Sequence, residues 1–121
     1  MHKTACVAMD IGGTNIRLAL ISRDGSILLR SSFPCKMDAG LDIFLQTIST
    51  GTEKLIGHAA RNGIKVAAVG AGVPGLIESS GNIISAVNLP PLDGFNLQQW
   101  LRNELGLPVT TLNDANAAAV A

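Results

Sequence analysis

Three short polar segments of the 121-residue sequence carry the side chains that could do chemistry. The first, Asp10–Arg17, reads DIGGTNIR and follows the apolar run Ala5–Met9. Glycine-rich turns can hold anions through backbone N–H groups, and Mg²⁺ prefers a few carboxylates together with phosphate oxygens. The segment therefore predicts a turn that receives phosphate and Mg²⁺, with Asp10 as the metal ligand.

The residues inside this turn have separable roles. We expect Gly12 and Gly13 to adopt positive φ angles, which glycine tolerates, while Thr14 and Asn15 offer hydrogen-bond donors. Arg17 has two interpretations, because it could approach the sugar or phosphate region or form an ion pair with the acid that opens the segment. Taken alone, the segment is also compatible with an ordinary hairpin carrying an exposed ion pair.

The second segment, Gly70–Gly75, reads GAGVPG and follows the predicted strand Ile64–Val69. It matches the dinucleotide-binding pattern G-x-G-x-x-G, but that site needs a helix whose N-terminus faces the pyrophosphate. Pro74 lies inside the pattern, and the residues after it turn back as a hairpin, so we reject NAD binding. The glycines then let the backbone approach a ligand, or form a tight loop with a purely structural role.

The third segment, Leu112–Asn116, reads LNDAN at the point where a strand opens into a helix. Asp114 could cap that helix by accepting hydrogen bonds from its first N–H groups. It could also be a general base that takes the proton of an attacking hydroxyl, with Asn113 orienting the substrate. Considered alone, the segment favours the capping role.

The intervening residues predict the elements that position these segments. Hydrophobic periodicity and turn residues indicate an antiparallel meander followed by helix-separated strands, in the order βββ-α-β-α-β-α. We expect an α/β fold with a five-stranded mixed sheet and helices on its faces. The predicted strands are 5–11, 16–21, 26–33, 64–69 and 109–112, with a small hairpin at 76–84, and the predicted helices are 41–61, 96–105 (capped by Asn96 or Asp93) and 115–121. Residues 88–94 are expected to form a loop without a regular element.

The three segments follow strands 5–11, 64–69 and 109–112 of this sheet. If those strands are parallel neighbours, the segments emerge at one edge, where open α/β sheets bind ligands. A phosphate turn, a glycine loop and an Asn–Asp pair at that edge predict a phosphoryl-transfer site that works by positioning and charge neutralisation. This combination favours Asp114 as a general base.

Composition narrows the possible partners. Nine basic and nine acidic residues give no formal net charge, so nothing favours nucleic acid or an anionic membrane. No segment approaches the ~20 apolar residues of a membrane span. Cys6, in a predicted buried strand, and Cys35 fit two reduced thiols, and we expect a cytoplasmic protein.

The motifs DIGGTNIR, GAGVPG, NLPPLDGF and NDANAAA, in this order and spacing, resemble the N-terminal lobe of the ROK family of sugar kinases and related repressors. That family belongs to the actin-like, ribonuclease-H-like ATPase clan, and the resemblance covers nearly the whole chain. It implies transfer of the γ-phosphate of ATP to a hydroxyl of a hexose, glucose-like or N-acetylated, in a cleft between two lobes. The resemblance places Asp10, Gly12, Gly13, Thr14, Asn15 and Arg17 at the phosphate and Mg²⁺ turn, and Gly75, Asn88, Asn113 and Asp114 at sugar hydroxyls, with Asp114 as the base.

The second lobe of that family, with its adenosine site, sugar-binding Glu and His residues and frequent zinc site, has no counterpart in the sequence. We therefore expect residues 1–121 to be a single domain, the N-terminal lobe, inactive alone and homodimeric through the second lobe. Four residues before the first strand leave no room for a repressor's helix-turn-helix, which favours a kinase. The alternatives are a sugar-binding regulatory lobe or truncated kinase without activity, and an actin-like or chaperone-type ATPase without a sugar acceptor. The Asn113–Asp114 pair argues against that ATPase.

Overall fold

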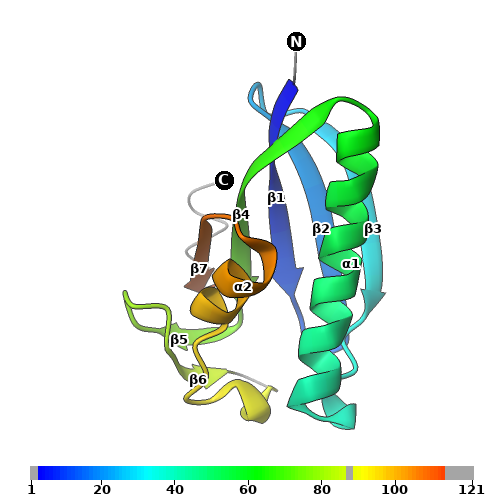
Figure 1. Cartoon of the computed structure of the whole chain (residues 1–121). Helices are drawn as coiled ribbons and strands as arrows, with labels where there is room; N and C mark the ends of the chain where they lie inside the picture. Colours follow the sequence, from blue (N-terminus) through cyan, green and yellow to red (C-terminus); the bar gives the residue numbers. More distant parts are fainter. Residues whose placement is uncertain (1–2, 87–88, 114–121) are drawn as a thin grey trace.

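The computed structural model describes residues 3–86 and 89–113 and contains a twisted mixed sheet with helices packed on one face (Figure 1). The strands of the main sheet lie in the order β3-β2-β1-β4-β7, and β5 and β6 form a separate two-stranded sheet. The elements are β1 Lys3–Ile11, β2 Asn15–Ser22, β3 Ile27–Pro34, α1 Leu41–Arg61, β4 Ile64–Val73, β5 Gly75–Ile77, β6 Ile83–Ala86, α2 Leu97–Leu105 and β7 Val109–Asn113, with 3-10 turns η1 at Met37–Ala39 and η2 at Pro90–Leu92.

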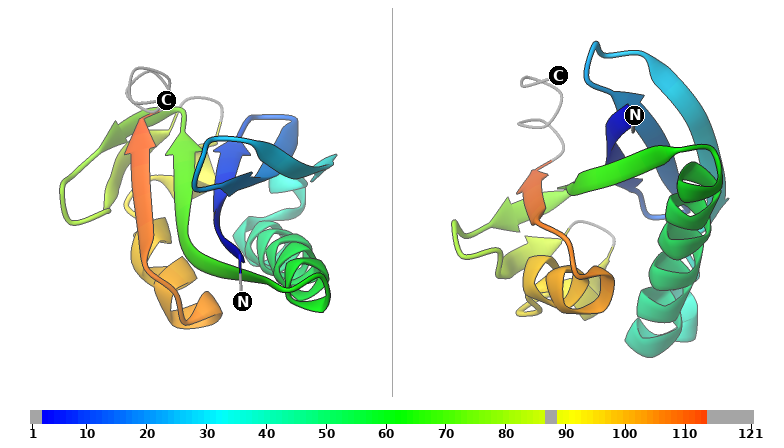
Figure 2. Two further views of the ribbon diagram at one scale, coloured as in Figure 1. Left: turned by 90° about the horizontal axis from the view of Figure 1, so that it is seen from above. Right: turned by 45° about the horizontal axis from the view of Figure 1, so that its top comes forward.

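The predicted topology is confirmed. Strands β1, β2 and β3 pair antiparallel as a meander, and β4 pairs parallel with β1 on one side and with β7 on the other. Alternate residues of β1, such as Val7 and Met9, are buried at 1% and 3% exposure and face the helices. Both described helices lie on this face of the sheet (Figure 2), so the hydrophobic core forms between them and the strands.

The opposite face of the sheet presents small and polar side chains. Cys6 points to this face and is exposed, whereas Cys35 is buried, and both are free thiols. The expectation of a buried Cys6 is therefore wrong, because strand alternation puts its neighbours Ala5 and Val7 toward the helices instead. Desolvation raises the pKa of the Cys35 thiol.

The first connections follow their sequence signals closely. Gly25, in the predicted Asp-Gly turn between β2 and β3, has φ 89°. Helix α1 has the predicted limits: Gly40 precedes it, and Gly63 with φ 73° follows its last turn. Gly51 lies in the middle of α1, where the ring of Phe33 packs so closely that a Cβ would lie 2.5 Å from its atoms.

Helix α2 ties the last strand to the hairpin. Asn96 caps the helix by accepting a hydrogen bond from the N–H of Gln99 (2.9 Å), so this one of the two predicted caps is confirmed. Asp93 instead accepts a hydrogen bond from the N–H of Ala86 (2.8 Å). The segment expected to lack a regular element contains the 3-10 turn η2, whose Pro90 presets the φ angle that such a turn needs.

Side chains of α2 form hydrogen bonds with the backbone groups at the outer edge of β7. Gln98, only 6% exposed, accepts hydrogen bonds from the N–H and the hydroxyl of Thr111, and its amide donates to the Ser80 carbonyl. Arg102 Nε donates to the carbonyl of Val109 at 3.0 Å. Helix α2 therefore covers polar groups that an edge strand would otherwise expose, and it holds the hairpin turn beside β7.

Candidate active site

The carboxyl ends of β1, β4 and β7 meet in one row across the sheet. Asp10 lies opposite Gly72 in the β1–β4 pairing, and Gly72 lies opposite Leu112 in the β4–β7 pairing. The left view in Figure 2 shows these three strands side by side. The three polar segments thus emerge at a common edge, as the sequence predicts.

Asp10 and Arg17 face each other across the β1–β2 pairing, and both are exposed. No ion pair joins them, or any other two side chains, within the part of the chain that the structure describes. Each therefore presents its charge to solvent at the edge where a ligand can approach. The interpretation of Arg17 as an ion-pair partner of Asp10 is wrong for this structure.

The turn after β1 is a four-residue loop. Ile11 and Ile16 form the last cross-strand pair, and the N–H of Gly12 donates to the carbonyl of Asn15 at 2.9 Å. The expectation of positive φ at Gly12 and Gly13 is wrong, because the described glycines with positive φ all lie at other positions. A loop of this length does not need the mirror-image turn that forces positive φ in two-residue hairpins.

Two contacts fix this turn. A Cβ on Gly12 would lie 3.1 Å from the carbonyl oxygen of Asn15, so the close approach of backbone accounts for a glycine there. The carbonyl of Thr14 accepts a hydrogen bond from the N–H of Cys35 at 2.8 Å. The turn is held both by its own closure and by the end of β3.

The glycine segment is mostly strand. Strand β4 continues to Val73, four residues beyond its predicted end, so Gly70 and Gly72 lie in the sheet and only Pro74 separates β4 from β5. Pairing with a parallel neighbour on each side outweighs the low strand preference of glycine. Gly75 is required at the turn, because a Cβ there would lie 1.9 Å from the carbonyl oxygen of Ser85.

Asn113 connects the ends of two predicted sugar-binding segments. Its side-chain amide donates a hydrogen bond to the carbonyl of Gly75, which begins β5. Asn113 is half-buried at the last position of β7, opposite Val73 of β4. The bond fixes the orientation of the amide group and joins β7 to the hairpin.

The remaining predicted residues lie outside the described residues. These are Asn88 and Asp114, together with the helix expected at 115–121. Sequence reasoning missed Gln98, whose three hydrogen bonds hold the hairpin turn against β7. A buried glutamine at the first turn of a helix carried no distinguishing signal in the sequence.

Among the described residues, no group of three or more His, Cys, Asp or Glu side chains could hold a metal ion by itself. Within residues 3–86 and 89–113, Asp10 is the one carboxylate in the row of strand ends. That donor set fits Mg²⁺ that keeps several waters and is bound mainly by the phosphates of a nucleotide. Over the same residues, no helix is long and apolar enough to cross a membrane.

The sequence profile of the ROK family matches residues 6–121. The chain belongs to the ROK family. Glucokinase of Halalkalibacterium halodurans is 33% identical over 115 residues, which cover 94% of this chain and 34% of that protein. The chain thus spans about a third of the length of this curated relative.

Solved structures of ROK proteins share the fold. The ROK glucokinase of Streptomyces griseus, in complex with glucose and AMPPNP, is 28% identical with a TM-score of 0.79, covering 95% of this chain and 35% of that one. A ROK transcriptional regulator, a homologue of the E. coli MLC protein, is 20% identical with a TM-score of 0.83, covering 98% and 30%. The second likeness shows the fold alone, so this ROK fold occurs in kinases and in regulators.

Proposed function

We propose that the complete protein is a sugar kinase, and that the 121-residue chain is its N-terminal lobe. The observation that carries the proposal is the row of strand ends, Asp10, Gly72 and Leu112, in a chain of the ROK family. The similarity to kinases along nearly the whole chain supports a transfer of phosphate from ATP to a hexose.

In this proposal the turn after β1 receives the phosphates. Asp10 would hold Mg²⁺ directly or through water, where the ion would supply positive charge beside the phosphate oxygens. Donors of Gly13, Thr14 and Asn15 bind phosphate oxygens, while Gly12, whose N–H is already donated to the Asn15 carbonyl, lets the backbone of the turn pack closely. Arg17, which has no carboxylate partner among the described residues, adds a positive charge at the same edge. The exposed, unpaired charges of Asp10 and Arg17 support these roles.

The sugar lies at the end of β7 and beside the hairpin. Gly75, Asn88 and Asn113 bind its hydroxyl groups. The hydrogen bond from the Asn113 amide to the Gly75 carbonyl orients the contact that Gly75 makes. Asp114 accepts the proton of the attacking hydroxyl as its oxygen bonds to the γ-phosphorus. The bond from that phosphorus to the bridging oxygen breaks, and ADP departs with its electron pair.

The same proposal covers the cellular location and the assembly of the complete enzyme. The complete enzyme would be a cytoplasmic homodimer whose second lobe completes the nucleotide site and carries any structural zinc. This lobe alone would not catalyse phosphate transfer. The second candidate function is a sugar-binding regulator without kinase activity, favoured by the 30% identity over 115 residues to a putative xylose repressor of Caldicellulosiruptor sp..

The test is a coupled assay of ADP release by the full-length protein with ATP, Mg²⁺ and glucose, fructose, mannose, N-acetylglucosamine or N-acetylmannosamine. A kinase gives stoichiometric sugar phosphate with at least one of them. A regulator gives calorimetric sugar binding without turnover. ATP hydrolysis that no sugar stimulates would instead indicate an actin-like ATPase.

A further inference from the structure

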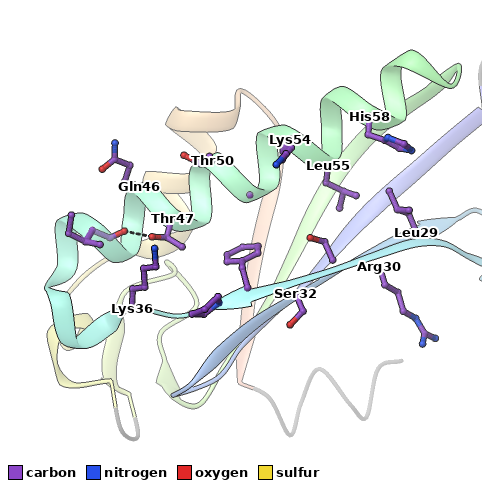
Figure 3. Close-up of a pocket in the computed structure, with 15 residues that line it drawn as sticks. Leu29, Arg30, Ser32, Lys36, Gln46, Thr47, Thr50, Lys54, Leu55 and His58 are labelled. Atoms are coloured by element: carbon purple, nitrogen blue, oxygen red, sulfur yellow. Dashed lines mark hydrogen bonds between the residues drawn. The ribbon is translucent and has the colours of Figure 1, made fainter.

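A groove of about 800 Å³ separates the edge strand β3 from helix α1 (Figure 3). Phe33 and Leu55 contribute to its apolar lining, and Ser31, Thr47 and Thr50 add hydroxyl groups. Phe33 and Gly51, which pack closely on each other, both line the groove. Nothing in the proposed kinase reaction uses this surface.

The strand that borders the groove is available for pairing. β3 is the first strand in the sheet order, so no strand described in the structure pairs with its outer side. Its residues alternate between half-buried positions such as Ser31 and exposed positions such as Arg30 and Ser32. Figure 3 shows Arg30 and Ser32 pointing away from α1, while Leu29 points toward it.

The groove is positively charged although the chain as a whole is neutral. Lys36 and Lys54 line it together with His58, and no carboxylate does. Lys36 has φ 57°, a left-handed conformation that non-glycine residues rarely adopt. Strand alternation adds Arg30 on the other side of the same strand. Both sides of the β3 edge therefore carry cations.

We propose that this edge binds an acidic peptide of a partner protein, which adds to β3 as an extended strand. Backbone groups of the peptide would pair with the outer side of β3, as in other complexes that extend a sheet. Its alternate side chains, about 7 Å apart, enter the groove, so an apolar residue meets Phe33 and Leu55 while carboxylates on either side meet Lys54 and Lys36. A carboxylate on its other face meets Arg30.

Charge distinguishes this occupant from a second copy of the chain. Pairing β3 with the β3 of another copy would bring Arg30 and the groove lysines of the two copies together without carboxylates between them. Like charges on neighbouring strands destabilise pairing, and cations on an edge strand commonly prevent such self-association. An acidic strand turns the same cations into attractive contacts.

The test is fluorescence polarisation of a labelled seven-residue peptide with valine at position 4, glutamate at positions 2, 3 and 6, and threonine elsewhere. The full-length protein should bind it, and binding should disappear when lysine replaces the glutamates or when residues 2–6 are N-methylated. Lys36→Glu and Lys54→Glu should each raise the Kd about tenfold, because each removes an attraction and adds a repulsion. Lys65→Glu, an exposed change on β4 outside the groove, should leave the Kd within about twofold.

Thermal unfolding of the variants, monitored by circular dichroism, separates lost binding from lost folding. Equal binding of the lysine peptide, or undiminished binding of the N-methylated peptide, would overturn the proposal. Two further results would overturn it if the protein does not bind the acidic peptide. One is binding to phosphatidylserine vesicles, and the other is concentration-dependent dimerisation that Lys54→Glu abolishes.

Discussion

The side-chain amide of Asn113, at the end of β7, donates a hydrogen bond to the backbone carbonyl of Gly75, 38 residues earlier in the chain. This bond joins the end of the sheet to the β5–β6 hairpin at the edge where the sugar is proposed to lie. The orientation of Asn113 therefore depends on the position of Gly75, and both are candidate sugar-binding residues.

Replacing Asn113 should therefore weaken sugar binding. Asn113→Ala removes the donor to Gly75, and Asn113→Asp places a carboxylate, which has no donor, against the same carbonyl. We expect both to raise the KM for the sugar about tenfold or more, with the aspartate variant at least as impaired, and to leave the KM for ATP little changed. The neighbouring exposed change Thr110→Ala is the control, and an equal effect there would contradict the role of Asn113.

Two glycines near this bond should respond in opposite directions to alanine. Gly75→Ala places a Cβ 1.9 Å from the carbonyl oxygen of Ser85, so the backbone must move, and we expect a loss of about 3 kcal/mol in the free energy of unfolding. Gly70→Ala has open space around its Cβ and no positive φ, so a gain of about 0.5 kcal/mol is expected. Urea denaturation measures both, and a similar loss at Gly70 would contradict the assignment of open space.

Gln98 should contribute strongly to stability although it touches no proposed ligand. Gln98→Leu leaves the N–H of Thr111 without its acceptor and the Ser80 carbonyl without one donor. The expected loss is about 2 to 3 kcal/mol in the free energy of unfolding. Gln99→Leu, an exposed change one residue along the same helix, should cost under about 0.5 kcal/mol. Comparable losses for the two variants would refute the structural role of Gln98.

The turn between β2 and β3 should make part of the stability depend on pH. The hydroxyl of Ser22 and the N–H of Ser26 donate to Asp24 and lower its pKa from 3.8 to about 2. Because the folded pKa lies below the unfolded one, this contribution is present above about pH 4 and is lost as pH falls through 2. The stability difference between the wild type and Asp24→Asn should shrink over that interval. A difference independent of pH would contradict the lowered pKa, which an NMR titration of the Asp24 carboxyl measures directly.

The elements with strong local signals were predictable from sequence. The 3.6-residue period and the flanking glycines specified α1 with its observed limits, and the Asp-Gly turn specified the β2–β3 hairpin. The parallel placement of β1, β4 and β7 followed from their order and the helices between them. The helix and the hairpin depend on residues that are close together in the chain, and the strand placement depends on the order of the elements.

Features that depend on contacts between residues far apart in the chain could not be predicted from the sequence. The glycines of β4 resembled a loop because their place between β1 and β7 is decided by strands far away in the chain. The bonds from Gln98 to Thr111 and from Asn113 to Gly75 join residues 13 and 38 positions apart, with no local pattern to announce them. The groove beside β3 likewise arises from the packing of Phe33 on Gly51, which neither segment reveals alone.

The role of Asp114 as the base of a sugar kinase can be tested with a single variant. Steady-state turnover of the full-length protein with ATP and its preferred sugar is compared with that of Asp114→Asn, alongside calorimetric sugar binding and thermal unfolding. We expect kcat to fall about a hundredfold to ten-thousandfold, the range for losing a general base, while the variant stays folded and still binds sugar. Near-normal turnover by Asp114→Asn would contradict it.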